Sequence, residues 1–464
     1  MLHLQPKKLP GLTESIFMLA LVIAVISYFI IDIGTSPHTP IFIGILILLG
    51  YGLSKQFTFD HLQYGMVQGA KSGMAAVLLF FVIGILIASW MASGTIPALM
   101  NVAFSLTGGP WLYAIVFAIT AITGVALGSS FTTAATVGVA FIGAAQSVDA
   151  SLPIMAGAIV SGAFFGDKMS PLSDTTNLAS TVVKVDLFEH IRNMTWTTIP
   201  AFVITFILFI FLSPESKEAS VLTPFEEGLA GTGLIHWSSW IPLIVLILFT
   251  LTKRSAFISL AITSITATVI AGIRGTMEWG ALFNAWFSGF QAESGNEAVT
   301  EMLSRGGMND MFFTISIVIL ALALGGLLFT TGIIPSILRN VQNGLRTARS
   351  ATLATAFTAI GINISVGEQY LSILLTGEAF QDIYEKTGLA RKNLSRTLED
   401  AGTVINPLVP WSVCGVFLSG VLGVPVLEYL PFAFFCLLSP LLTILFGFTG
   451  KTLTKKPKTK AEAS

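Results

Sequence analysis

Long apolar runs without charged residues alternate with short polar segments along almost the whole chain. A membrane helix needs about 20 mostly apolar residues to cross about 30 Å of hydrocarbon. The longest run, Ser72–Val148, is long enough for three crossings, or for two crossings and a re-entrant hairpin. The pattern predicts an all-α polytopic membrane protein with about 12–14 hydrophobic segments. The charge-free runs are Ser15–Ile31, Thr39–Ser54, Ser72–Val148, Ala150–Gly166, Asn193–Pro214, Thr232–Thr252, Ser255–Ile273, Met311–Leu338, Ser350–Gly367, Ala401–Leu427 and Tyr429–Gly450.

The composition supports the same fold class. Of the 464 residues, 53% are hydrophobic and 11% are charged, whereas soluble domains carry roughly 25% charged residues. Such a chain cannot cover its surface with polar side chains, so its main solvent is the lipid bilayer. The net charge of −1 excludes a nucleic-acid partner, and the two cysteines, Cys414 and Cys436, lie in apolar runs rather than in a disulfide framework.

Charges outside the apolar runs predict the orientation. Lys7 and Lys8 precede the first run and the tail from Lys451 is basic, so the positive-inside rule places both termini in the cytoplasm. The loop Glu215–Gly233 is acidic and is expected on the external side. We therefore predict a first repeat over residues 1–214, an external linker over 215–233, a second repeat over 234–450 and a cytoplasmic tail over 451–464.

The two long regions resemble each other. Three matches occur in the same order at offsets of 236–239 residues: Pro97 with Pro335, Gly128 with Gly367, and Ser170-Pro-Leu with Asn406-Pro-Leu. The loop after Pro97 carries no charge up to Val148, whereas the loop after Pro335 carries three arginines. The positive-inside rule then places corresponding loops on opposite faces. Inverted repeats of this kind are typical of secondary transporters, whose sites form near the bilayer midplane where the repeats meet.

The densest polar cluster within an apolar region is the stretch from Gly162 to Asn177. A helix that starts near Leu152 reaches Asp167 after about 22 Å, which is inside the hydrocarbon. Pro171 then removes a backbone donor and predicts a helix break. Freed carbonyls would lie beside carboxylate and hydroxyl oxygens, the ligands that hard cations prefer. The predicted cation-binding residues here are Asp167, Ser170, Asp174, Thr175 and Thr176. The alternative is a cytoplasmic helix end whose charges reach water.

The corresponding region of the second repeat adds further candidates. Pro407 and Pro410 interrupt a run that otherwise crosses the membrane, and they place Thr403 and Asn406 beside freed backbone. Asp400 is a candidate carboxylate, although it and Glu399 would also suit a solvated first turn of this helix.

The glycine-rich stretch Gly124–Gly138 either packs closely against a neighbouring helix or lines the site through Ser129 and Thr133. The repeat match places Glu368 opposite Ser129. Glu368 emerges near the external face if Ser350–Gly367 crosses the membrane, and it lies at a hairpin tip near the midplane if that segment is one arm of a hairpin.

The string from Gly166 to Thr176, Gly-Asp-Lys-Met-Ser-Pro-Leu-Ser-Asp-Thr-Thr, resembles the signature of the NhaC-type sodium/proton antiporters, a branch of the ion transporter superfamily. The Gly-Ser-Ser-Phe-Thr-Thr stretch from Gly128 and the Pro-Leu-Val-Pro-Trp stretch from Pro407 also fit that family. The resemblance implies a homodimer in a bacterial plasma membrane, with a mobile transport domain and elevator-like alternating access. The family also includes antiporters that exchange malate and protons for lactate and sodium.

The chemistry of the predicted site fits sodium/proton antiport. Burial favours the neutral form of a carboxyl group whereas a bound sodium ion favours the ionised form, so the two cations compete for one site. Glu368 or Asp400 would complete the site or carry protons. Lys168 would neutralise a carboxylate in the empty state, or else extend towards the cytoplasm.

Other classes of function fit the sequence less well. The chain lacks a Walker A loop and the Gly-x-Ser-x-Gly and His-Glu-x-x-His motifs, so we expect neither an enzyme nor a cofactor. Organic-acid exchange remains the alternative. Because Lys168 is the cationic group placed within the core motif, an inorganic cation is favoured over a dicarboxylate.

Overall fold

The computed structural model describes residues 8–107, 110–147, 150–214, 223–292, 296–343 and 345–456. These residues fold into helices joined by turns. One isolated β-bridge pairs Leu389 with Lys455. The predicted all-α class is therefore confirmed. The helices of the N-terminal part are α1 (Leu12–Ile31), α2 (His38–Ser54), α3 (Phe59–Ser72), α4 (Met74–Ala92), α5 (Thr95–Thr107), α6 (Leu112–Leu127), α7 (Ser130–Thr133), α8 (Val139–Ser147), α9 (Leu152–Met169), α10 (Asp174–Val182) and α11 (Leu187–Leu212).

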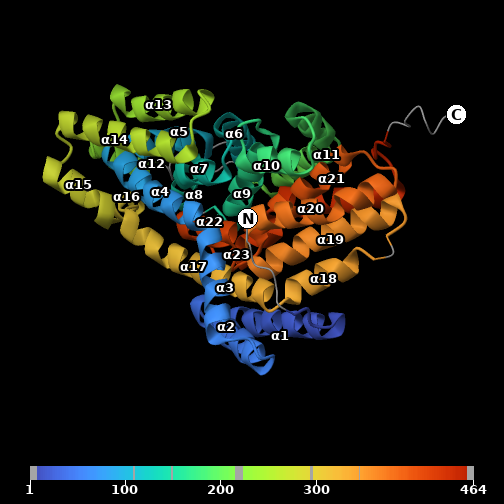
Figure 1. The fold of residues 1–464 in the computed structure, drawn as a ribbon. Coiled ribbons are helices and arrows are strands. Elements are labelled where there is room, and N and C mark those ends of the chain that lie inside the picture. Colours follow the sequence, from blue (N-terminus) through green and yellow to red (C-terminus); the bar gives the residue numbers. More distant parts are fainter. Residues whose placement is uncertain are drawn as a thin grey trace.

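The C-terminal part also contains long and broken helices. Its helices are α12 (Thr223–Gly231), α13 (Ile241–Leu251), α14 (Ala256–Arg274), α15 (Trp279–Ser288), α16 (Glu297–Leu303), α17 (Met308–Thr330), α18 (Ile333–Val341), α19 (Ala348–Val366), α20 (Gln369–Lys386), α21 (Arg391–Leu398), α22 (Val413–Leu422), α23 (Val426–Tyr429) and α24 (Phe434–Thr449). In Figure 1, α6–α10 lie beside α19–α21 at the centre, while α1 and α2 lie at the lower edge and α13 and α14 at the upper edge.

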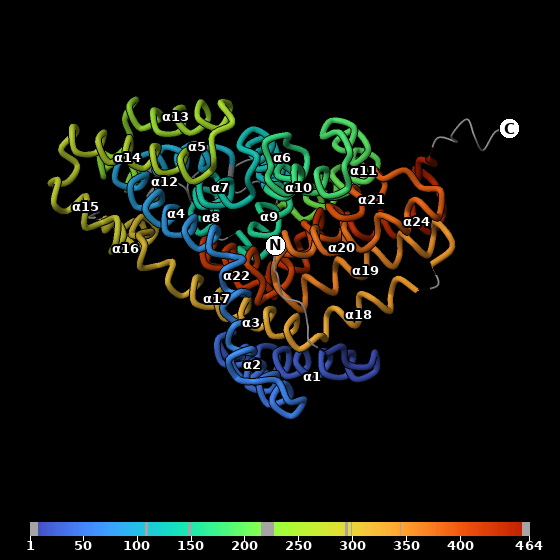
Figure 2. The backbone as a smooth tube through the Cα atoms, viewed as in Figure 1, coloured from blue at the N-terminus to red at the C-terminus, as the bar shows by residue number. Residues whose placement is uncertain are grey.

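Many of the apolar runs do not form straight crossings. Within the described residues, α1, α4, α11, α14 and α17 are each long and apolar enough to span a bilayer. The number is up to seven if each of two bent pairs is one span, and four further apolar helices are shorter: His38–Ser54, Thr95–Leu106, Leu112–Leu127 and Trp237–Leu251. The chain is a multi-pass membrane protein with broken helices, as predicted. Figure 2 follows the backbone through these breaks.

Close packing of α6 on α9 explains several glycines of the two segments. An added Cβ at Gly166 would lie 2.4 Å from the Cα of Gly124, and one at Gly162 would lie 2.0 Å from the Thr120 Oγ1 atom. The matched positions advance in the same direction along both helices, so α6 and α9 run parallel. Small residues let the two backbones approach closely, and this approach fixes the position of Asp167, the residue after Gly166.

Gly166→Ala is expected to destabilise the protein by about 1–3 kcal/mol, because the new methyl group overlaps backbone that cannot move independently. Gly361→Ala is the matched control, since an added Cβ at this helical glycine meets nothing within 4 Å. The control should leave stability unchanged or raise it by up to about 1 kcal/mol. Thermal unfolding in detergent measures both, and equal unfolding temperatures would contradict the packing account.

Two helical hairpins have the same construction at their tips. The first runs from α6 to α7, a π-helical turn over Ala134–Gly138 and α8, and the second pairs α19 with α20. Each outgoing helix ends on a left-handed glycine, Gly128 with φ 64° and Gly367 with φ 74°. Each returning helix starts on a side-chain cap, Ser129 or Glu368. Glycine is needed at both tips because a side chain strains this backbone conformation.

The open ends of the two hairpins lie on opposite sides of the molecule. Tyr113 at the start of α6 receives a hydrogen bond from the Ser151 amide (2.9 Å) and donates its own amide to Ser213 Oγ (3.1 Å). The open end of the first hairpin therefore lies on the same side as the start of α9 and the end of α11. At the other end of α9–α10, the Val182 carbonyl accepts from the Gln381 amide group near the end of α20 (2.8 Å). This geometry supports the predicted inverted repeats, whose boundaries remain a proposal.

Candidate cation-binding site

Asp167 lies where α9 breaks. Ser170 leaves the helical conformation (φ −81°, ψ 130°) directly before Pro171, and Ser173 then caps α10 by accepting from the Thr176 amide. Pro171 cannot continue the helix, so the chain starts a new one. The Asp167 side chain is 5% exposed. The break places the carboxylate of Asp167 beside two hydroxyl groups from different elements.

Both oxygens of Asp167 accept hydrogen bonds. Ser173 Oγ donates to Oδ1 at 2.5 Å, and Ser130 Oγ donates to Oδ2 at 2.7 Å. The Ser130 amide also points to Oδ2 at 3.4 Å. Ser130 belongs to the tip of the first hairpin, so this carboxylate joins the hairpin to the broken helix.

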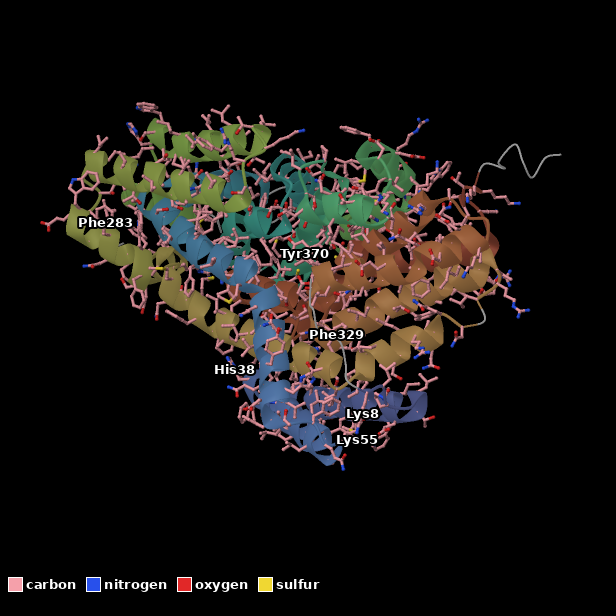
Figure 3. All side chains as sticks on the ribbon, viewed as in Figure 1. Lys8, His38, Lys55, Phe283, Phe329 and Tyr370 are labelled. Carbon is pink, nitrogen blue, oxygen red and sulfur yellow. The ribbon has the colours of Figure 1, made fainter. Side chains whose placement is uncertain are left out.

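A cavity of about 360 Å³ extends from Asp167. It is lined by Asp174, Thr175 and Ser129, and by Gln369 and Tyr370 from the tip of the second hairpin. Figure 3 places Tyr370 near the centre of the molecule, where green helices of the N-terminal part lie beside orange helices of the C-terminal part. The cavity continues past Leu187 to the turn between α13 and α14, and so reaches the side on which α11 begins.

The predicted residues around Pro171 take different roles. Asp174 is exposed and faces the cavity, and Thr175 shares a hydrogen bond with Ser173 (3.0 Å). Thr176 instead donates to the Lys168 carbonyl (3.1 Å), one of the groups freed by the break. Ser170 Oγ accepts from the Leu172 amide (3.2 Å) and stabilises the turn. Thr176 and Ser170 therefore shape the site through the backbone.

The predicted residues in the first hairpin, Ser129 and Thr133, lie on either side of the residue that makes the main contact. Ser129 caps α7 and lines the cavity, while Thr133 donates to the Ser129 carbonyl at 2.9 Å. Ser130, which contacts Asp167 directly, was not among the predicted site residues. The signal for it was the repeat match, because Ser130 corresponds to Gln369 and both follow a capping residue at a hairpin tip.

Lys168 and Asp400 form a second, separate charge centre. Their side chains make an ion pair in which both are completely buried. Asp400 also accepts from Thr197 at 3.2 Å and from Thr443. Lys168 does not extend to the cytoplasm, because α9 is surrounded by protein along this turn. Successive helical residues point about 100° apart, so Asp167 and Lys168 face different surroundings.

Glu399 lies beside this ion pair in a π-helical turn over Glu399–Thr403. It is 0% exposed, and Thr403 on the same turn, which is also buried, interacts with its carboxyl group. Glu399 and Asp400 are thus in the protein interior rather than in a solvated first turn.

Glu368 lies at the tip of the second hairpin, one of the two positions considered from the sequence. Its Oε2 accepts from the Leu371 amide at 2.7 Å and caps α20. Asn406 lies at the other helix break, where it donates to Asn363 Oδ1 on α19 (2.8 Å) and accepts from the Cys414 amide on α22 (2.9 Å). Neither side chain lines the cavity at Asp167.

Two cations at the cavity fall outside the motif considered in the sequence. Lys253 and Arg254, both exposed, line it from the turn between α13 and α14. Lys168, the cationic group within the motif, is not among the residues that line this cavity. Lys168 is paired with Asp400 in the second charge centre, whereas a distant turn of the chain supplies positive charge to the cavity.

The fold and the site define a membrane transporter built on broken helices. Residues 162–451 match the model of the Na+/H+ antiporter family. The chain is 40% identical over 455 residues to the Na(+)/H(+) antiporter NhaC of Alkalihalophilus pseudofirmus, covering 96% of this chain and 97% of that protein. It is 39% identical to the protein of the same name from Bacillus subtilis, covering 94% and 96%. It is also 32% identical to the malate-2H(+)/Na(+)-lactate antiporter of Bacillus subtilis, covering 98% of each chain.

The chain belongs to the Na+/H+ antiporter family. The family resemblance seen in the motif from Gly166 to Thr176 is thereby confirmed, and the protein is a transporter rather than an enzyme.

Proposed function

We propose that the protein exchanges Na+ for H+ across the plasma membrane of a bacterium by alternating access. The observation that carries this proposal is the Asp167 carboxylate, held by Ser130 and Ser173 at the inner end of a cavity that reaches one side of the molecule. Asp174 and Thr175 add oxygen ligands at the same place. Carboxylate and hydroxyl oxygens suit a hard cation such as Na+.

Competition at Asp167 would couple the two ions. A proton neutralises the buried carboxyl group, and Na+ instead compensates its charge, so the site holds one or the other. The proposed core ligands are Asp167, Asp174 and Thr175, together with Ser130 and Ser173. Asp400 and Glu399, which lie in the second charge centre, are the candidates for a separate proton-carrying role.

We propose that the cavity opens to the cytoplasm. It reaches the side on which α11 begins, close to the base of the second hairpin. The C-terminal segment pairs with that base, since the Ala390 amide donates to the Thr454 carbonyl at 3.0 Å. The basic tail that follows favours the cytoplasmic side. In this orientation both termini are cytoplasmic and the structure faces inward.

We also propose a homodimer, on the resemblance to the family. The molecular mass of the detergent-solubilised protein checks this, because a monomeric mass would contradict it.

The ion specificity is tested in vesicles that contain the purified protein and an imposed proton gradient. Addition of Na+ should dissipate the gradient, whereas K+ should leave it at the rate of empty vesicles. For Na+ to dissipate the gradient, it is sufficient that the protein exchanges Na+ for protons. A gradient that survives saturating Na+ would contradict the proposed function.

Sodium-coupled organic-acid exchange is the second candidate. Lys253 and Arg254 supply positive charge to a cavity that is larger than one cation requires, and one relative is a malate and lactate antiporter by name. In the same vesicles, this function requires malate or lactate together with Na+ for any dissipation. Equal rates with and without the organic acids would exclude it.

A further inference from the structure

Gln369 is the first residue of α20, directly after the capping residue of the second hairpin. Its side chain is 3% exposed and lines the cavity that contains Asp167, Asp174 and Thr175. The carbonyl oxygen Oε1 has no hydrogen-bond partner among the described residues. Leaving such an acceptor without a partner costs about 1–3 kcal/mol. A buried polar atom of this kind requires an explanation.

The cavity that Gln369 lines also holds two carboxyl groups. Asp167 and Asp174 contribute carboxylates to the cavity, and both lie within electrostatic range of the neighbouring Tyr370. A third acceptor beside two carboxylates is unfavourable unless a cation lies among them. An amide oxygen is also one of the ligands that hard cations prefer.

The repeat match gives the same position independently. Ser130 is the first helical residue after the cap of the first hairpin, and it contacts Asp167. Gln369 is the corresponding residue of the second hairpin, at the same distance from a left-handed glycine. The two hairpin tips thus present equivalent positions to one cavity.

We propose that the carbonyl oxygen of Gln369 is a direct ligand of the transported cation. This inference rests on the proposed Na+/H+ exchange and adds a ligand from the second hairpin to the site that Asp167, Ser130 and Ser173 form in the first half of the chain. A cation bound in this way links the two hairpin tips, so its affinity depends on how they are placed relative to each other. Cation binding is then coupled to the arrangement of the two halves.

Gln369→Leu tests the proposal, because leucine has a similar size and no oxygen. The Na+ concentration for half-maximal proton flux should rise about tenfold, equivalent to about 1.4 kcal/mol, while the maximal rate stays within about twofold. The Na+ concentration that raises the unfolding temperature in detergent, measured against equal K+, should shift by the same factor. Gln381→Leu is the matched control, since Gln381 lies on the same helix and bonds the Val182 carbonyl away from the cavity.

Gln369→Glu separates the ligand role from a packing role. It keeps the shape and the oxygen and adds a charge, so half-saturation should occur at the wild-type Na+ concentration or below. If Gln369→Leu does not fold, Gln369→Asn replaces it, and the retracted oxygen should raise the half-saturating concentration severalfold. If the half-saturating Na+ concentration of Gln369→Leu equals that of the wild type, the inference is overturned and Na+/H+ exchange is left intact. A water molecule that fills the position of the amide oxygen would give this result. Absence of Na+-dependent flux in the wild type overturns the exchange itself.

Discussion

Asp167→Asn is expected to reduce Na+-dependent proton flux by at least about a hundredfold, equivalent to about 2.8 kcal/mol. The carboxylate accepts from Ser130 and Ser173 and lies at the inner end of the cavity. Asparagine keeps the shape of the side chain but cannot carry the negative charge or the exchangeable proton. Both ions lose their common site. Proton flux in Na+-loaded vesicles measures the loss.

Asp186→Asn is the matched control for this substitution. Asp186 is exposed and caps α11 by accepting from the Phe188 and Glu189 amides. Asparagine caps a helix about as well as aspartate, so flux and stability should match the wild type. Wild-type flux in Asp167→Asn would remove Asp167 from the mechanism, whatever the control shows.

Asp400→Asn is expected to lower the free energy of unfolding by about 3–5 kcal/mol, because it leaves the Lys168 ammonium group buried without its partner. Both side chains of the pair are completely buried, in contrast to the partly exposed pair of Lys392 and Glu189. Glu189→Gln should therefore cost less than about 1 kcal/mol. Thermal unfolding in detergent compares the two, and equal losses would contradict the account.

A double substitution separates the structural role of this pair from its role in transport. Removing both charges of a buried pair is often close to neutral for stability, so Lys168→Met with Asp400→Leu should regain most of what Asp400→Asn loses. Transport should be absent in the double variant if the pair participates in proton movement. Full flux with restored stability would show that the pair is structural.

The sequence located the first helix break accurately, because its signals are local. Pro171 cannot donate a backbone hydrogen bond, and serine and aspartate beside it favour the start of a new helix. Asp167 and Asp174 were predicted as site residues for the same reason, and both line the cavity. The all-α class followed from the length of the apolar runs.

Long-range pairings were harder to predict. Nothing near Lys168 in the sequence indicates Asp400, which is brought to it by the packing of α24, α11 and the π-helical turn around α9. Asn406 was predicted as a ligand, and the structure adds two hydrogen bonds, with Asn363 and the Cys414 amide, that the sequence does not indicate. Lys253 and Arg254 line the cavity because of tertiary packing alone.

The cavity also determines where the membrane voltage acts. Water and ions that enter it carry the potential of one side inward to Asp167, so the remaining voltage drop falls across the protein beyond that residue. A charge that crosses the full potential gains or loses about 2.3 kcal/mol per 100 mV. In the proposed inward-facing state, most of this energy is therefore exchanged during the conformational change, and little of it while the ion moves through the cavity.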